Sequence, residues 1–187
     1  MAQYSKIAQY TGAEIIDLAE AKLYLRVDYT TDDSYITDLI KIVRVQILKD
    51  TNQVLVSQLI TEYFSEWTKE LVLQYPGTLS NYALRYYDSS NTDTLLVEGT
   101  DYRIIECFGL VKLEIIQAPT LYNRLDAIRF DYIVAPQNSD SIAPLKIALY
   151  MLLQHYYDNR SAVSFLKAEE MPLGYKSIIA NYKNYIL

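Results

Sequence analysis

The stretch Ser141–Val163, SIAPLKIALYMLLQHYYDNRSAV, sets the architecture of this 187-residue chain. Its large apolar residues recur at spacings of four, three and four, the pattern of an amphipathic helix with one broad buried face. The residues of this face are Leu145, Leu149, Leu152 and Tyr156, widened by Ala148 and Met151. Ser141 is a good N-cap, and Pro144 suits the first turn, where a missing N–H costs nothing. We therefore expect a central helix in which each fully buried residue contributes about 1.5 to 3 kcal/mol.

Two helices are expected before the middle of the chain. Asp17, followed three residues later by Glu20, has the capping-box arrangement and predicts a helix over residues 18–27. Polar residues 31–33 place a cap and negative charge before a second helix, which ends near Asn52. Its buried stripe is expected to consist of Ile36, Leu39, Ile40, Val43 and Ile47. Residues 1–14 are expected to form a loose leader.

Between residues 54 and 135 the apolar period changes from 3.6 to 2, which indicates strands with one buried face. Alternation is clearest over residues 71–75, 82–86, 111–115 and 128–134, and turn residues such as Pro76-Gly77 and Gly109 separate these runs. The spacing predicts about seven short strands in an antiparallel sheet or sandwich. With about four helices around it, the expected fold class is α+β. The expected domains are 1–53 and 137–187, which together form a helical domain, and 54–136, an inserted β domain.

The end of the chain predicts one more helix. Its apolar residues follow the spacing i, i+3, i+4, i+7 and i+11: Tyr175, Ile178, Ile179, Tyr182 and Ile186. A helix of about 12 residues is marginal alone in water, so it needs a surface to lie on, either its own core or a partner's.

Composition limits the class of protein. No window approaches the 18 uninterrupted apolar residues of a membrane span, and the N-terminus lacks the apolar region of a signal peptide, so we expect a soluble, non-secreted protein. The single cysteine, Cys107, excludes an intramolecular disulfide and indicates a reducing compartment. The net charge of −6, with scattered Lys and Arg, lacks the basic footprint of a nucleic-acid binder. Nineteen tyrosines suit protein interfaces.

Residues that could carry chemistry are few. His155 is the only histidine, and its expected role is packing on the central helix. Cys107 follows Glu106 in strand-like sequence, where a buried, inert thiol is expected. Asp32-Asp33 is explained by the start of a helix. The sequence contains no phosphate-binding glycine loop, no nucleophile elbow and no calcium loop, so we expect no enzyme activity, cofactor or metal.

The pattern as a whole resembles the head-tail connector, or adaptor, proteins of tailed bacteriophages and gene-transfer particles. The matching pieces occur in the family's order and cover most of the chain: Leu18-Ala19-Glu20-Ala21-Lys22, Tyr24-Leu25-Arg26-Val27-Asp28, Asp32-Asp33, Tyr86-Tyr87-Asp88, Asp101-Tyr102-Arg103, Pro144-Leu145, His155-Tyr156-Tyr157, Asn159-Arg160 and Met171-Pro172-Leu173-Gly174. The chain departs from the family at Thr51-Asn52-Gln53, where the family has a Thr-Gly-Arg type of turn.

The resemblance implies a structural protein of the virion neck, assembled in the host cytoplasm. Its subunits would form a ring of about twelve with two different contact faces each. The ring would sit beneath the portal and join it to head-completion or tail-completion proteins, while DNA would pass through without sequence-specific binding. The C-terminal residues Tyr175, Ile178, Ile179, Tyr182, Tyr185 and Ile186 would contact the portal or another partner. Tyr156, Tyr157 and Arg160 would lie at a subunit interface.

Two alternatives remain from the residues alone. One is a non-viral interaction module with the same helices and sheet. The other is a small enzyme that uses His155, which would require a cleft with a carboxylate of shifted pKa beside it.

Overall fold

The computed structural model describes residues 3–75, 77–107, 110–136, 139–160 and 172–183. The chain forms two compact units, each containing more than one segment of the sequence. A β unit comprises the described residues of Met1–Gly12 and Val56–Pro136, and a helical unit comprises those of Ala13–Leu55 and Gln137–Tyr185. The fold class is α+β, as the sequence predicts.

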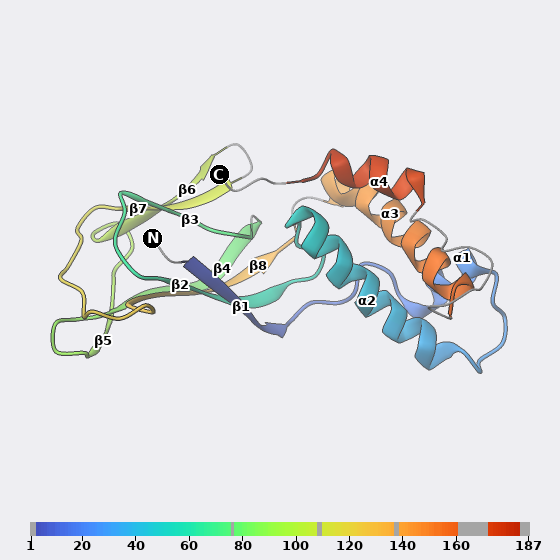
Figure 1. Ribbon diagram of the computed structural model, residues 1–187, viewed down its shortest axis with the longest axis horizontal. Helices are drawn as coiled ribbons and strands as arrows, with labels where there is room; N and C mark the ends of the chain where they lie inside the picture. The colour runs from blue at the N-terminus through green and yellow to red at the C-terminus, as the bar shows by residue number, and fades with distance from the viewer. Residues whose placement is uncertain (1–2, 76, 108–109, 137–138, 161–171, 184–187) are drawn as a thin grey trace. The chain divides into compact units, whose positions relative to one another are not determined.

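The helical unit contains the four described helices, as predicted. They are α1 (Leu18–Leu25), α2 (Asp33–Thr51), α3 (Ser139–Asp158) and α4 (Leu173–Ala180) (Figure 1). The capping box at α1 is present: the Asp17 carboxylate accepts the Glu20 backbone N–H at 2.7 Å, and the Glu20 carboxylate accepts the Asp17 N–H at 3.3 Å. The C-cap of α2 is Asn52, which has the left-handed φ of 56° that its side chain tolerates.

The start of the central helix differs from the prediction. Helix α3 begins at Ser139, so Ser141 lies within the helix and is not its N-cap. Pro144 therefore stands beyond the first turn, where its missing N–H removes a bond to the carbonyl of residue 140. The helix tolerates this because its apolar face is fixed by tertiary packing.

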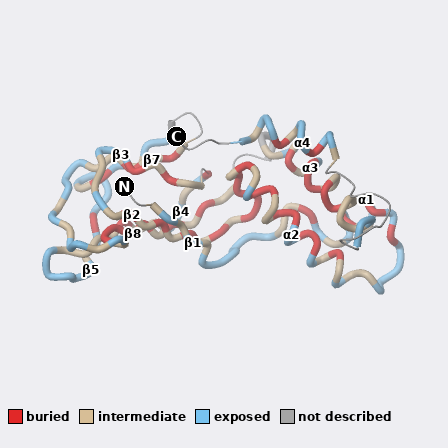
Figure 2. The backbone as a smooth tube through the Cα atoms, viewed as in Figure 1, coloured by how far each residue is buried: buried red, intermediate tan, exposed pale blue. Residues whose placement is uncertain are grey.

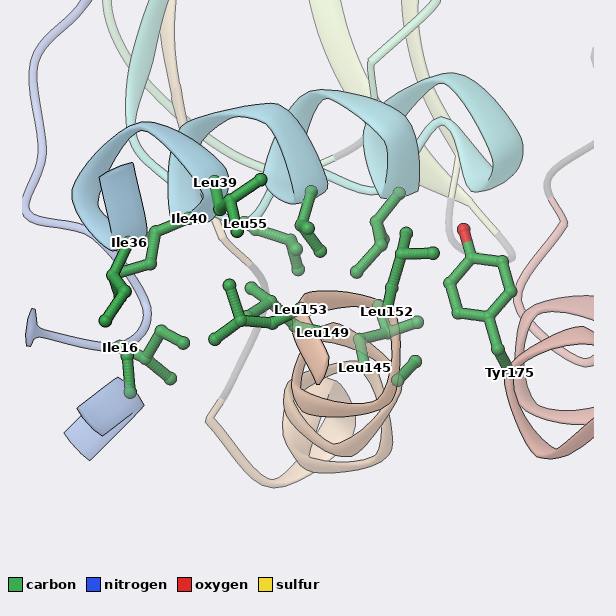
Figure 3. Close-up of a cluster of buried hydrophobic side chains, with 14 of the residues drawn as sticks. Ile16, Ile36, Leu39, Ile40, Leu55, Leu145, Leu149, Leu152, Leu153 and Tyr175 are labelled. Atoms are coloured by element: carbon green, nitrogen blue, oxygen red, sulfur yellow. The ribbon is translucent and has the colours of Figure 1, made fainter. Parts of the chain in front are cut away.

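The core of the helical unit lies between α2 and α3. The predicted stripe of α2 is buried, and it meets the buried residues of α3 (Figure 3), which are Leu145, Ala148, Leu149, Leu152 and Leu153. Tyr156, predicted as the last residue of the α3 stripe, is only partly buried and packs against the edge of this cluster. Tyr175 of α4 completes the core at the end of α2 (Figure 3).

The β unit contains two antiparallel sheets in two layers (Figure 1). The larger sheet has the order β1-β2-β8-β4-β5, and its strands are Gln3–Tyr10, Gln58–Phe64, Ile128–Ala135, Thr78–Tyr87 and Asp93–Leu95. The smaller sheet has the order β3-β7-β6, and its strands are Glu70–Val72, Leu110–Ile115 and Tyr102–Cys107. Burial alternates strictly along β2 and β8, as the period of two predicts (Figure 2).

The N-terminal residues are the main correction. The expected loose leader contains β1, which pairs antiparallel with β2 from Gln3 opposite Phe64 to Tyr10 opposite Gln58. Its sequence, QYSKIAQY, has only Ile7 as a branched aliphatic residue, so it carried little strand signal. The structure therefore has eight described strands, one more than the approximate number predicted.

None of the helices in the described part of the chain combines the length and hydropathy needed to cross a membrane.

Candidate functional site

The end of α3 and the start of α2 together form a polar cluster, here called the Asp32 cluster. It consists of Tyr29, Asp32, Tyr35, Tyr157 and Arg160, and two of the predicted interface residues belong to it. Asp32 occupies the N-cap position of α2, but its side chain makes no capping hydrogen bond. Its carboxylate instead accepts bonds from residues that are far away in sequence.

Three donors converge on one oxygen of Asp32. The Tyr157 hydroxyl donates to Asp32 Oδ2 at 2.6 Å, the Tyr29 hydroxyl donates at 3.2 Å, and the Arg160 guanidinium forms an ion pair with the same atom. The Arg160 bond, followed by that of Tyr157, holds the pKa of Asp32 down at about 2. Asp32 is therefore ionised throughout the physiological range.

Arg160 also lies on two aromatic rings. Its guanidinium carbon is 4.6 Å from the centre of the Tyr157 ring and 4.8 Å from that of Tyr35. Cation–π contacts and a charge-assisted bond together fix a long side chain that would otherwise be mobile. The Arg160 side chain is still 48% exposed, so the cluster presents a fixed cation at the surface.

Tyr156 and His155 have packing contacts on α3. The Tyr156 carbonyl accepts the Tyr35 hydroxyl at 3.4 Å, and burial raises the pKa of the Tyr156 phenol. His155 is half-buried, its ring lies 5.8 Å from that of Tyr156, and its carbonyl accepts the Asn159 side-chain amide at 3.0 Å. The described residues include no group of three His, Cys, Asp or Glu side chains that could hold a metal ion.

The predicted partner-contact residues at the end of the chain divide into three groups. Tyr175 and Ile179 are buried in the core of the helical unit, and the Tyr175 hydroxyl donates to Asp50 Oδ2 at 2.6 Å. Ile178 and Tyr182 are partly buried against the same core. Tyr185 and Ile186 lie outside the described residues. Helix α4 also presents an exposed residue that was not among the predicted partner contacts, Leu173, which is 79% exposed.

The β unit contains a buried carboxylate that sequence reasoning missed. Glu62 has no exposed surface, and it accepts the Tyr132 hydroxyl, the Gln74 N–H at 2.9 Å and the Gln3 amide at 3.0 Å. Burial raises the pKa of Glu62, while these donors act in the opposite direction. The available signal was alternation, because Ile60 and Phe64 place residue 62 on the buried face. Glu62 ties three strands and the segment after β3 together, which is a structural role.

The Cys107 side chain lies outside the description, although its backbone ends β6.

One family model matches part of the chain in sequence. Residues 15–96 match the sequence model described as "Phage gp6-like head-tail connector protein". No curated protein matches the chain in sequence.

Solved structures with a similar fold come from gene transfer agent (GTA) particles. The neck of an empty GTA particle computed with C6 symmetry contains a chain with 17% identity and a TM-score of 0.71, and the match covers 100% of this protein and 97% of that chain. A chain in the virion of a native GTA particle has 17% identity and a TM-score of 0.76, with 98% and 96% covered. A chain in the neck of a native GTA particle computed with C12 symmetry has 18% identity and a TM-score of 0.69, with 96% of each covered. At these identities the structural likeness shows a shared fold.

Over residues 15–96 the protein is therefore similar to the phage gp6-like head-tail connector proteins, the family that its sequence resembles.

Proposed function

We propose that this protein is a structural connector of a virion neck, joining the DNA-filled head to the neck or tail as part of a ring. The observation that carries the proposal is the agreement of two comparisons: a connector-family match over residues 15–96 and a fold shared with GTA neck and virion chains over 96% or more of this chain. The role is structural and not catalytic.

A ring of about twelve subunits beneath the portal is the form we propose, supported by a fold match to a neck chain computed with C12 symmetry. Each subunit then needs two different contact faces. We place one of them at the exposed edge of the Asp32 cluster, where Tyr157 and Arg160 are held in fixed positions. The protein's negative charge suits a channel that lets DNA pass without sequence-specific binding.

Contact with the portal is assigned to α4 and the residues after it. Tyr175 and Ile179 already serve the core of the helical unit, so the portal would meet the outward side of α4, which carries Leu173. Head-completion or tail-completion proteins would meet another face of the ring. Assembly would take place in the host cytoplasm, before the tail joins the head.

Deleting the gene tests this function. The expected product is DNA-filled heads without attached tails, and wild-type protein supplied from a plasmid should restore tailed particles. Electron microscopy of necks with a tagged but functional protein should place the tag at the head-tail junction. Tailed, infectious or transducing particles that form without the protein would refute the proposal.

A further inference from the structure

The outward side of α2 carries apolar residues in addition to those that form the core. Ile42, Val45 and Lys49 recur at i, i+3 and i+7, so they share one side of the helix, away from the buried side with Val43 and Ile47. Ile42 is 53% exposed and Val45 is half-buried. The outward side of a helix in a globular unit is normally polar, so these apolar residues suit a side that a partner covers.

This side of α2 is also hollowed. A shallow hollow of about 280 Å³ lies on it, with a lining that is mostly apolar. The Gln46 amide in this lining donates to Asp50 Oδ1 at 3.0 Å, which fixes one wall. A cavity of about 150 Å³ holds benzene, so the volume suffices for an aliphatic side chain. The lining residues, here called the α2 outer face, are Lys41, Ile42, Val45, Gln46 and Lys49.

The α2 outer face is positively charged at both ends. Lys41 forms an exposed ion pair with Asp38 at 3.0 Å, whereas Lys49 makes no ion pair within the described residues. Two lysines and one aspartate leave one net positive charge. On packed helices, charged residues that flank an apolar strip select the partner by charge. The matching partner is therefore apolar at its centre and acidic beside it.

The same unit carries a second exposed apolar surface, here called the α1/α3 face. It consists of Leu23 and Tyr24 of α1 and Ile147 and Tyr150 of α3. Leu23 is 82% exposed, Ile147 52% and Tyr24 42%. The rings of Tyr24 and Tyr150 stack with their centres 4.6 Å apart, so residues of the two helices form one surface. Apolar residues that gather in a patch mark an interaction surface, unlike those that are scattered singly.

Carboxylates lie beside Leu23 on this face. Asp17 and Glu20, the capping box of α1, are both exposed, and Glu20 is one turn before Leu23. Glu20 also pairs with Lys146 of α3 at 2.9 Å, which fixes the two helices to each other. Two carboxylates and one lysine leave one net negative charge. The α1/α3 face is thus apolar and acidic, which is the chemistry that the α2 outer face matches.

The two faces lie on opposite sides of the helical unit. The core lies between α2 and α3 (Figure 3), where Leu149 and Leu153 of α3 are buried. Ile147 precedes Leu149 by two positions, so it points to the far side of α3, while Ile42 points away from the core on α2. One neighbour cannot cover both sides of a unit. Two different, complementary faces of this kind generate a ring when the rotation between neighbours closes.

A nucleic acid suits the α2 outer face less well than a second copy does. Binding to a phosphate backbone depends on several Lys and Arg side chains, and this face offers two, of which Lys41 is already paired with Asp38. The apolar centre at Ile42 and Val45 would gain nothing from phosphates. A second copy of the chain supplies both the apolar and the acidic part of the match.

We propose that the α2 outer face of one copy packs against the α1/α3 face of the next copy, with Leu23 seated in the hollow between Lys41 and Lys49. The proposal rests on the proposed ring-forming function and names the second contact face which that function requires. It agrees with a first contact face at the Asp32 cluster, because Tyr157 follows Tyr150 by two turns on the same side of α3.

Cysteine cross-linking in assembled particles tests the contact. In a Cys107→Ser background, which removes the only native cysteine, Leu23→Cys and Ile42→Cys are combined. Treatment with a short bismaleimide should give a ladder of dimers, trimers and higher multimers of this chain. Each single-cysteine variant should give none, because the two sides of a ring contact come from different faces. Both replaced side chains are exposed, and unchanged thermal melting shows that the variants are folded.

The matched control replaces an equally exposed leucine of the β unit. Leu125 is 72% exposed, and Leu125→Cys combined with Ile42→Cys should give no ladder, because the helical unit of the next copy covers Ile42. A ladder from this control pair would refute the α1/α3 face as the occupant. A dimer from Ile42→Cys alone would refute it too, since it would show that two α2 outer faces meet across a two-fold axis.

The outcomes separate the two proposals. If the protein is present in particle necks but the Leu23/Ile42 pair gives no ladder, this contact is refuted while the connector function stands. Cross-linking of Ile42→Cys to a different neck protein likewise refutes the contact alone. If the protein is absent from necks, the connector function fails, and the contact fails with it.

Discussion

The hydroxyl of Tyr157 donates to the Asp32 carboxylate across 2.6 Å, joining the last turn of α3 to the residue before α2. Arg160 reaches the same oxygen from one turn further on. The carboxylate that the sequence assigns to a helix cap therefore serves a tertiary contact between residues 125 or more positions apart. Because these contacts need an ionised Asp32 carboxylate, the stability of the helical unit should depend on pH.

Asp32→Asn should weaken the helical unit at neutral pH but not at strongly acidic pH. The pKa of Asp32 is about 2 in the folded protein, against about 3.9 in an unfolded chain. A lowered pKa contributes stability that is present above about pH 4 and is lost as the pH falls towards about 2. Urea unfolding followed by circular dichroism at 222 nm should show the difference between wild type and variant shrinking over that interval.

Asp38→Asn is the matched control, since Asp38 lies on the same helix in an exposed ion pair with Lys41. Exposed pairs of this kind contribute about 0 to 1 kcal/mol. The control should lose no more than about 1 kcal/mol at neutral pH. An Asp32→Asn curve that stays parallel to wild type down to about pH 2 would contradict the role of the carboxylate.

Local signals in the sequence predict much of this fold. Asp17 and Glu20 lie within one turn, and the alternation in β8 reports a face that is buried over its whole length. Pairings across long separations are different. Strand β1 is defined by β2, whose paired residues are 48 to 61 positions away, and its own residues carry no strong strand preference. The sequence does not predict the partners of Asp32 for the same reason. Nothing in the residues around Asp32 points to Arg160, and nothing around Arg160 points to Asp32.

The difference in stability between Glu62→Gln and wild type should change with pH in the opposite sense to that of Asp32→Asn. The pKa of Glu62 is raised by burial, so its contribution is present below the unfolded value of about 4.3 and is lost as the pH rises through the folded pKa. The variant should therefore gain stability relative to wild type as the pH rises above about 4. The fluorescence of Trp67, the only tryptophan, reports unfolding of this unit.

Glu70→Gln provides the contrast within the same unit. Lys112 holds the pKa of Glu70 below its usual value, so this variant should lose a little stability relative to wild type as the pH rises. If the stability of both variants relative to wild type changes in the same direction as the pH rises, the assignment of Glu62 as a buried group with a raised pKa is wrong.

Substitutions at Tyr175 should affect folding, whereas a substitution at Leu173 should affect portal binding alone. Tyr175→Ala leaves a cavity in the core and should cost about 3 to 5 kcal/mol, while Tyr175→Phe loses the bond to Asp50 and should cost about 1 to 3 kcal/mol. Leu173→Asp changes an exposed side chain and should alter stability by less than about 0.5 kcal/mol.

Only Leu173→Asp is then suitable for a pull-down with purified portal protein. Weaker binding by this folded variant would support contact through the outward side of α4, and unchanged binding would move the portal contact elsewhere. Removal of residues 172–187 should unfold the helical unit, because Tyr175 is part of its core.

Gly77→Ala should destabilise the protein, whereas Gly174→Ala should not. A Cβ at Gly77 would lie 2.4 Å from the Ala135 carbonyl oxygen and 2.5 Å from Val134 Cγ2. The carbonyl belongs to β8, which is bonded on both sides in the sheet, so the backbone has little freedom to move away. Overpacking of this kind costs about 1 to 3 kcal/mol, and Gly77→Ala should lower the urea midpoint seen by Trp67 fluorescence.

At Gly174 a Cβ would meet only the end of the Met151 side chain, at 3.1 Å from Sδ and 3.2 Å from Cε. Methionine adapts its rotamer readily, and alanine is favoured over glycine in a helix by about 0.5 to 1 kcal/mol. Gly174→Ala should therefore leave the helical unit unchanged or slightly more stable when it is followed at 222 nm. Equal destabilisation by the two variants would mean that Met151 is held as firmly as the β8 backbone.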